Sequence, residues 1–125
     1  MKLKFSSSWK SSIHPRKQRK FRANAPLHIH TSFVGVHLSK DLKQKIGKRA
    51  MPAREGDTVK VIRGQYKGKT GKIRSVNRKF ERIIIEGVEQ PKRDGSKAPV
   101  PIHPSNLMLI DLVPDKKRQK RSEKK

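Results

Sequence analysis

The stretch from Glu55 to Glu89 constrains the fold of this chain most strongly, because short apolar runs alternate there with glycines. Val59 and Val61 alternate with polar neighbours, which is typical of a strand with one buried face. Between Thr58 and Phe80 there are eight Lys or Arg residues and no acidic residue. Positive charges without acidic partners suit a surface that meets a polyanion. The stretch therefore predicts a small β domain that binds nucleic acid, with RNA as the favoured ligand.

The apolar pattern predicts five short strands, at residues 57–63, 69–76, 80–86, 99–102 and 107–112. Gly71 lies inside the second of these, where a glycine indicates a bulge or a close approach of another backbone segment. Prolines confine the fourth to the edge of a sheet. The connections leave no room for crossover helices. We therefore predict a mainly β fold, a small SH3-like antiparallel barrel.

The two ends of the chain differ from its middle in charge. Residues 1–50 carry thirteen Lys or Arg and one acid, and residues 115–125 carry seven and two, within a formal net charge of +23. We accordingly divide the chain into a basic N-terminal extension (1–50), a β domain (51–114) and a basic disordered tail (115–125). One short helix is predicted in the extension, at about 39–46. Ser39 provides its N-cap and Gly47 its C-cap.

The extension contains a run of five basic residues between Pro15 and Ala23, interleaved with the aromatic residues Trp9, Phe21 and Phe33. No sustained helical or strand period runs through the first thirty-one residues. A disordered, solvated tail is one interpretation of such a charge run. The aromatic rings leave two further interpretations open: they stack on unpaired bases while the cations cover phosphates, or they pack on the central domain.

Composition and spacing exclude several functions. The chain has no cysteine, so disulfides and thiolate metal sites are absent, and the pair formed by His28 and His30 has no third ligand nearby in sequence. The segment from Gly64 to Thr70 is one residue too short for a phosphate-binding loop of the Walker type. No spacing groups Ser, His and acidic residues into a catalytic site. There is no apolar run long enough for a membrane span and no secretory signal pattern. We expect an intracellular, unprocessed chain that is not an enzyme and needs no cofactor or metal.

The strand, loop and strand from 57 to 76 resemble the KOW motif, which certain ribosomal proteins and transcription elongation factors share. The matching positions are Gly56, Asp57, Val59, Val61, Gly64, Lys67, Gly68, Lys69, Gly71, Ile73, Val76, Glu86 and Gly87. Flanking segments at residues 24–28 (NAPLH), 38–42 (LSKDL), 51–54 (MPAR) and 102–106 (IHPSN) resemble a narrower family. This is the archaeal and eukaryotic branch of the universal large-subunit ribosomal protein twenty-four family, called twenty-six in eukaryotes.

The resemblance implies an SH3-like barrel on the large ribosomal subunit, located in the cytoplasm. It implies binding to the 5′ region of the large-subunit ribosomal RNA, a role in early subunit assembly and a position near the peptide exit tunnel. The implied partners are this RNA, neighbouring large-subunit proteins, and the nascent chain or exit-site factors, without membrane or small-molecule substrate. The main alternative is a KOW-type transcription or translation factor that binds RNA transiently. A general DNA-compacting protein is a further alternative.

Fourteen residues are predicted to contact RNA: the five cations of the basic run at 16–22, the eight cations between residues 60 and 79, and one tyrosine in the glycine-bounded loop. They are Arg16, Lys17, Arg19, Lys20, Arg22, Lys60, Arg63, Tyr66, Lys67, Lys69, Lys72, Arg74, Arg78 and Lys79. For Tyr66 two roles remain open: it stacks on or hydrogen-bonds to RNA, or it packs over the end of the barrel.

Overall fold

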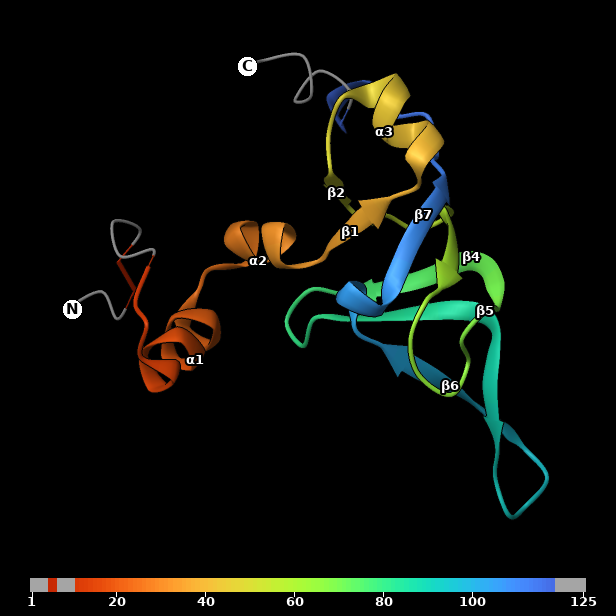
Figure 1. Cartoon of the computed structure of the whole chain (residues 1–125). Helices are drawn as coiled ribbons and strands as arrows, with labels where there is room; N and C mark the ends of the chain where they lie inside the picture. The colour runs from red at the N-terminus through yellow and green to blue at the C-terminus, as the bar shows by residue number, and fades with distance from the viewer. Residues whose placement is uncertain (1–4, 7–10, 119–125) are drawn as a thin grey trace.

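The computed structural model of the chain describes residues 5–6 and 11–118 (Figure 1). Within them the chain forms a seven-stranded mixed sheet in the order β2-β1-β7-β3-β4-β5-β6. The strands are β1 (Gly35–Leu38), β2 (Ala50–Pro52), β3 (Thr58–Val61), β4 (Thr70–Asn77), β5 (Arg82–Pro91), β6 (Lys97–Ile102) and β7 (Leu107–Asp111). The helices are α1 (Pro15–Asn24), α2 (Leu27–Phe33), α3 (Lys40–Ile46) and the 3₁₀ helix η1 (Pro104–Asn106).

The prediction of a mainly β fold is confirmed, and β3 to β7 correspond to the five predicted strands. In detail the sheet differs from the predicted barrel. It is open, with β2 and β6 at its two edges, and it is not wholly antiparallel, because β1 pairs with β7 in parallel. A parallel pair requires a long connection, and along the chain β2 to β6 all lie between β1 and β7. β5 and β6 extend into a long hairpin that projects from the body of the sheet (Figure 1).

The sheet begins earlier in the chain than the sequence indicates. β1 and β2 lie before or across residue 51, mostly in the segment interpreted as extension, and they contribute Val36, Leu38 and Met51 to the core. Their lengths of four and three residues leave too few positions for a recognisable strand period. The boundary at residue 51 rests on the distribution of charge and stays a prediction. The sheet itself starts at Gly35.

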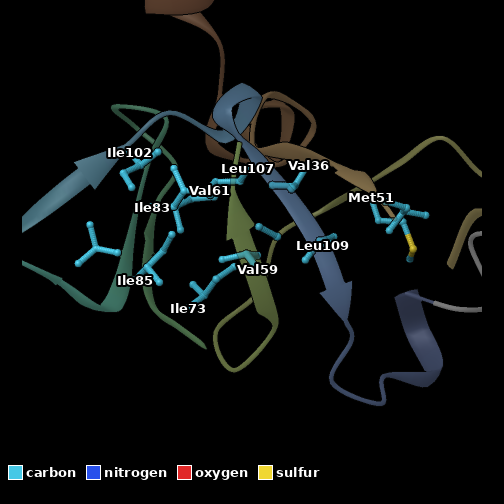
Figure 2. Packing of buried hydrophobic residues seen from close by; sticks show 13 residues of the cluster. Val36, Met51, Val59, Val61, Ile73, Ile83, Ile85, Ile102, Leu107 and Leu109 are labelled. Carbon is cyan, nitrogen blue, oxygen red and sulfur yellow. The ribbon is translucent and has the colours of Figure 1, made fainter. Parts of the chain in front are cut away.

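A single apolar cluster runs along the sheet from Ile102 on β6 to Met51 on β2 (Figure 2). Val59 and Val61 are buried in it, as the alternation in β3 predicts. In β5, Ile83 and Ile85 are buried and Ile84 between them is half-buried. Burial of alternate residues on one side leaves the polar side chains of β3 and β4 on the opposite, outer side.

Gly71 lies where β4 crosses close to β5. A Cβ atom at this position would be 2.5 Å from the carbonyl oxygen of Glu86. The predicted close approach of backbone is therefore confirmed. The register between β4 and β5 shifts a few residues later, between Ile73 and Ser75, and this irregularity increases the local twist of the pair.

The predicted short helix is α3, and both of its predicted caps are present. The Ser39 hydroxyl accepts a hydrogen bond from the Leu42 amide at 3.4 Å. Gly47 has a left-handed backbone with φ of 72°, and its amide donates to the Lys43 carbonyl at 2.8 Å. Leu42 and Ile46 pack against the core cluster. A helix of two turns needs such docking, because it is marginally stable alone.

The sequence does not predict α1 and α2, although its prolines mark where they start. His14 and Ala25, the residues before Pro15 and Pro26, are extended as expected from their neighbours. Pro15 then occupies the first helical position, where proline is favoured because its missing amide would have no partner there. α1 buries none of its residues. A helix without a buried face has no apolar period by which to recognise it.

Candidate RNA-binding surface

Three of the predicted cations lie on the outer side of β3 and β4. Lys60 is opposite Thr70, and Lys72 is opposite Thr58. Arg74 follows the buried Ile73, and all three cations are exposed. They form the first part of the candidate surface.

The loop between β3 and β4 holds further cations on a fixed turn. Gly64 and Gly68 both have positive φ, of 98° and 91°, a conformation that glycine adopts without steric cost. The Gly68 amide donates to the Val61 carbonyl at 2.8 Å, which closes the loop. The predicted cations here, Arg63, Lys67 and Lys69, are exposed.

Tyr66 is half-buried in this loop and packs against the core cluster. The Lys69 ammonium lies 5.0 Å from the centre of its ring. Of the two roles left open by the sequence, the structure therefore displays packing at the end of the sheet. Contact of its remaining exposed edge with RNA stays a prediction.

α1 presents the second group of predicted cations. Arg16, Lys17, Arg19 and Lys20 are all exposed, and the helix contains no acidic residue. The spacing of three and four residues places Arg16, Arg19 and Lys20 on one face. These four cations have no acidic residue beside them on the helix, so their charge is available to an external partner.

Arg22 differs from these cations because its side chain contacts other residues of the protein. Its Nη1 atom is 2.6 Å from the Oε2 atom of Glu81, and its guanidinium lies 5.1 Å from the centre of the Phe33 ring. Phe33 in turn meets Phe21 edge to face, with ring centres 6.2 Å apart. Phe21 and Phe33 therefore pack within the protein rather than standing free for bases. Trp9 lies outside the described residues.

The turn between β4 and β5 carries the remaining predicted cations, Arg78 and Lys79, both exposed. The salt bridge from Arg22 to Glu81 joins α1 to this turn, and Figure 1 shows the turn extending on the side where α1 and α2 lie. The structure thus brings two groups of cations together that are far apart in the chain. The β4–β5 turn also exposes Phe80, which sequence reasoning did not select.

A buried ion pair at Asp57 is another feature that the sequence does not reveal. Arg118 donates from Nη1 to Oδ2 of Asp57 at 2.7 Å and from Nη2 to Oδ1 at 3.0 Å. Asp57 is fully buried and Arg118 is 5% exposed. Arg118 belongs to the segment predicted to be a tail, so the start of that segment is fastened to the sheet. Residues 119–125 lie outside the described part.

The described residues contain no group of three or more His, Asp or Glu side chains placed to hold a metal ion. Among the same residues, no helix is long and apolar enough to cross a membrane. His103 does approach an acid, with its Nε2 atom 3.5 Å from Oε2 of Glu81. Arg22 and His103 thus both contact Glu81, which lies in the β4–β5 turn.

The fold and this surface define a small, strongly basic, mainly β protein of the KOW type. Residues 12–125 match a family profile that describes the ribosomal proteins L26 of eukaryotes together with their archaeal counterparts of the L24 type. The chain belongs to this family, and it is a structural ribosomal protein rather than an enzyme.

Individual relatives agree with the family assignment. A large ribosomal subunit protein uL24 of Methanosphaera stadtmanae is 44% identical over 108 residues, which cover 86% of this chain and 92% of the relative. A protein of the same name from Methanocella arvoryzae is 47% identical over 105 residues, which cover 84% and 85%. The resemblance inferred from the KOW residues and their flanking segments is therefore confirmed.

Proposed function

We propose that the chain is a component of the large ribosomal subunit in the cytoplasm that binds the 5′ region of the large-subunit ribosomal RNA. It supports early assembly of the subunit and lies near the peptide exit tunnel, beside neighbouring ribosomal proteins and within reach of the nascent chain or exit-site factors. The observation that carries the proposal is that the predicted cations are exposed and almost all unpaired. All of them are exposed, and within the described part of the chain all except Arg22 lack a carboxylate partner.

The exposed cations are distributed over three parts of the surface. α1, the outer side of β3 and β4, and the β4–β5 turn each present several. Unpaired charge on a folded surface works against compaction unless a polyanion neutralises it. A single folded RNA can supply phosphates to all three places at once. Family membership favours ribosomal RNA over other polyanions.

Binding through phosphates predicts a strong dependence on salt. If roughly eight phosphates are engaged, the affinity falls by about 10³- to 10⁵-fold between about 50 and 200 mM monovalent salt. The probe is a transcript of the 5′ region of the large-subunit ribosomal RNA from the organism that encodes the chain. An affinity for this transcript that is nearly independent of salt would refute phosphate binding.

A matched pair of variants tests which cations are responsible. The first replaces Lys17, Arg19 and Lys20 of α1 by Ala. The second replaces three cations of the β5–β6 hairpin, outside the predicted set, which are Lys92, Arg93 and Lys97. Both lose the same charge, so long-range attraction changes equally. The proposal predicts that the α1 variant binds more weakly and has a salt dependence reduced by about three phosphate contacts. Equal losses in both variants would contradict the assignment of the surface.

Co-sedimentation separates a ribosomal component from a transiently bound KOW factor. Large subunits are centrifuged through sucrose gradients containing high salt. A component held in folded RNA stays with the large subunit, whereas a factor washes off. Recovery of the chain in the soluble fraction at the top of the gradient would support the factor instead.

A binding measurement with duplex DNA tests the other alternative. If the chain binds duplex DNA about as tightly as it binds the 5′ transcript, a general DNA-compacting protein is supported.

A further inference from the structure

Phe80 is a large apolar side chain that the fold leaves in solvent. It lies in the turn between β4 and β5 and is 64% exposed. Its sequence neighbours Arg78 and Lys79 are exposed cations, and the Lys79 ammonium is 5.5 Å from the centre of the ring. Exposure of a single phenylalanine has no benefit for folding, because burial of its ring would stabilise the protein.

The backbone of the turn fixes Phe80 in this position. The Phe80 amide donates to the Asn77 side-chain oxygen at 3.2 Å. The next residue, Glu81, has a left-handed backbone with φ of 54°, which is uncommon for residues other than glycine. This conformation turns the Glu81 side chain into the protein, where it is buried, while the preceding side chain stands outside.

Glu81 is held by contacts from three other residues. Arg22 Nη1 is 2.6 Å from its Oε2 atom and His103 Nε2 is 3.5 Å from the same atom. Arg82 Nη1 donates to its carbonyl oxygen at 3.1 Å. The only carboxylate of the turn is therefore paired internally, so the surface around Phe80 presents cations to solvent. The contact with Arg22 also places this turn next to the basic helix α1.

A flat apolar ring on a fixed turn among cations suits one kind of occupant. Unpaired nucleotides offer a flat base that stacks on aromatic rings and a phosphate that binds Lys or Arg. A protein partner with an apolar patch would favour apolar neighbours around Phe80, and the neighbours here are Arg78, Lys79 and Arg82. The charge of the turn therefore favours RNA over protein.

We propose that Phe80 stacks on an unpaired base of the bound RNA, with Arg78 and Lys79 holding the adjoining phosphates. This inference rests on the proposed function and adds the class of RNA feature that the turn recognises, a single-stranded or bulged nucleotide. Stacking on one base corresponds to about a 5- to 150-fold change in affinity. It is independent of salt, unlike the phosphate contacts, and this difference allows the two to be measured separately.

The test uses the full chain with Phe80→Ala, Phe80→Leu and Phe80→Trp and the same 5′ transcript. The Ala and Leu variants are expected to bind at least about fivefold more weakly with an unchanged salt dependence, and the Trp variant to retain wild-type affinity. Thermal unfolding of all three should match that of the wild type, because residue 80 is exposed. Wild-type affinity of Phe80→Ala would overturn the inference and leave the proposed function standing. Full retention by Phe80→Leu alone would overturn stacking in favour of simple apolar packing.

Ultraviolet crosslinking locates the contact directly. Irradiated complexes of the wild-type chain and the transcript are digested and analysed by mass spectrometry. The expected result is a nucleotide attached at Phe80, at a position of the RNA that chemical probing finds unpaired. A crosslink from this peptide to a base within a continuous duplex would overturn the inference. Failure of the wild-type chain to bind the transcript at all would overturn the proposed function together with it.

Discussion

Replacement of Arg118 by Met should destabilise the fold, because Arg118 neutralises the buried carboxylate of Asp57. Loss of one partner of a buried ion pair typically costs about 3–5 kcal/mol, since the other charge stays buried without compensation. Asp57 keeps two other donors, the Arg54 amide at 3.0 Å and the Val113 amide at 2.9 Å. We therefore expect a loss near the lower end of that range, about 3 kcal/mol.

The assay is urea unfolding of the full chain in moderate salt, followed by far-ultraviolet circular dichroism. Lys117→Met is the matched control, because it removes the same charge from the adjacent, exposed residue. Its effect should be within about 0.5 kcal/mol. Asp57→Ala should cost more than Arg118→Met, because the backbone amides of Arg54 and Val113 also lose their acceptor. If Arg118→Met is no less stable than Lys117→Met, the buried pair does not fasten this segment and the reasoning is refuted.

Three further predictions concern local features. Gly71→Ala should destabilise the sheet by about 1–3 kcal/mol in the same urea assay, because its Cβ would lie 2.5 Å from the Glu86 carbonyl oxygen; an unchanged midpoint would contradict the close packing. Ser39→Ala should cost about 1 kcal/mol and speed hydrogen exchange of the amides in α3, and unaltered exchange would argue against the cap. The Ser96 hydroxyl and amide, which donate to Asp94 at 2.7 and 3.0 Å, lower the pKa of that carboxyl. Because the pKa is lowered in the folded state, the hairpin turn gains stability above the unfolded-state pKa and loses it as the pH falls through the folded value. NMR titration should find the pKa of Asp94 below its ordinary value, and Ser96→Ala should raise it.

The parts of the fold that the sequence predicts are those with local signals. Strand β3 is marked by alternation around Val59 and Val61, and α3 by caps at Ser39 and Gly47. β1 and β2 are too short to produce a period, and they become strands because they complete a core formed by distant residues. α1 has no buried face, so its helical state is marked only by Pro15 at its first position.

The candidate surface is predictable in its charge and not in its arrangement. A run of cations without acids identifies α1 and the β3–β4 region as exposed and basic. Arg22 belongs to the same run, but its partner Glu81 lies 59 positions away. Arg118 and Asp57 are 61 positions apart. Such pairs depend on the folded topology, and a sequence pattern cannot separate them from cations that face RNA.

The structure of an intact large ribosomal subunit that contains this chain is the most direct test of RNA binding by these cations. We expect side-chain nitrogens of α1 and of the outer side of β3 and β4 to lie within hydrogen-bonding distance of phosphates in the 5′ region of the large-subunit ribosomal RNA. We also expect the β4–β5 turn to face the same RNA. A subunit in which these cations point into solvent, or in which the chain contacts only other proteins, would contradict this expectation.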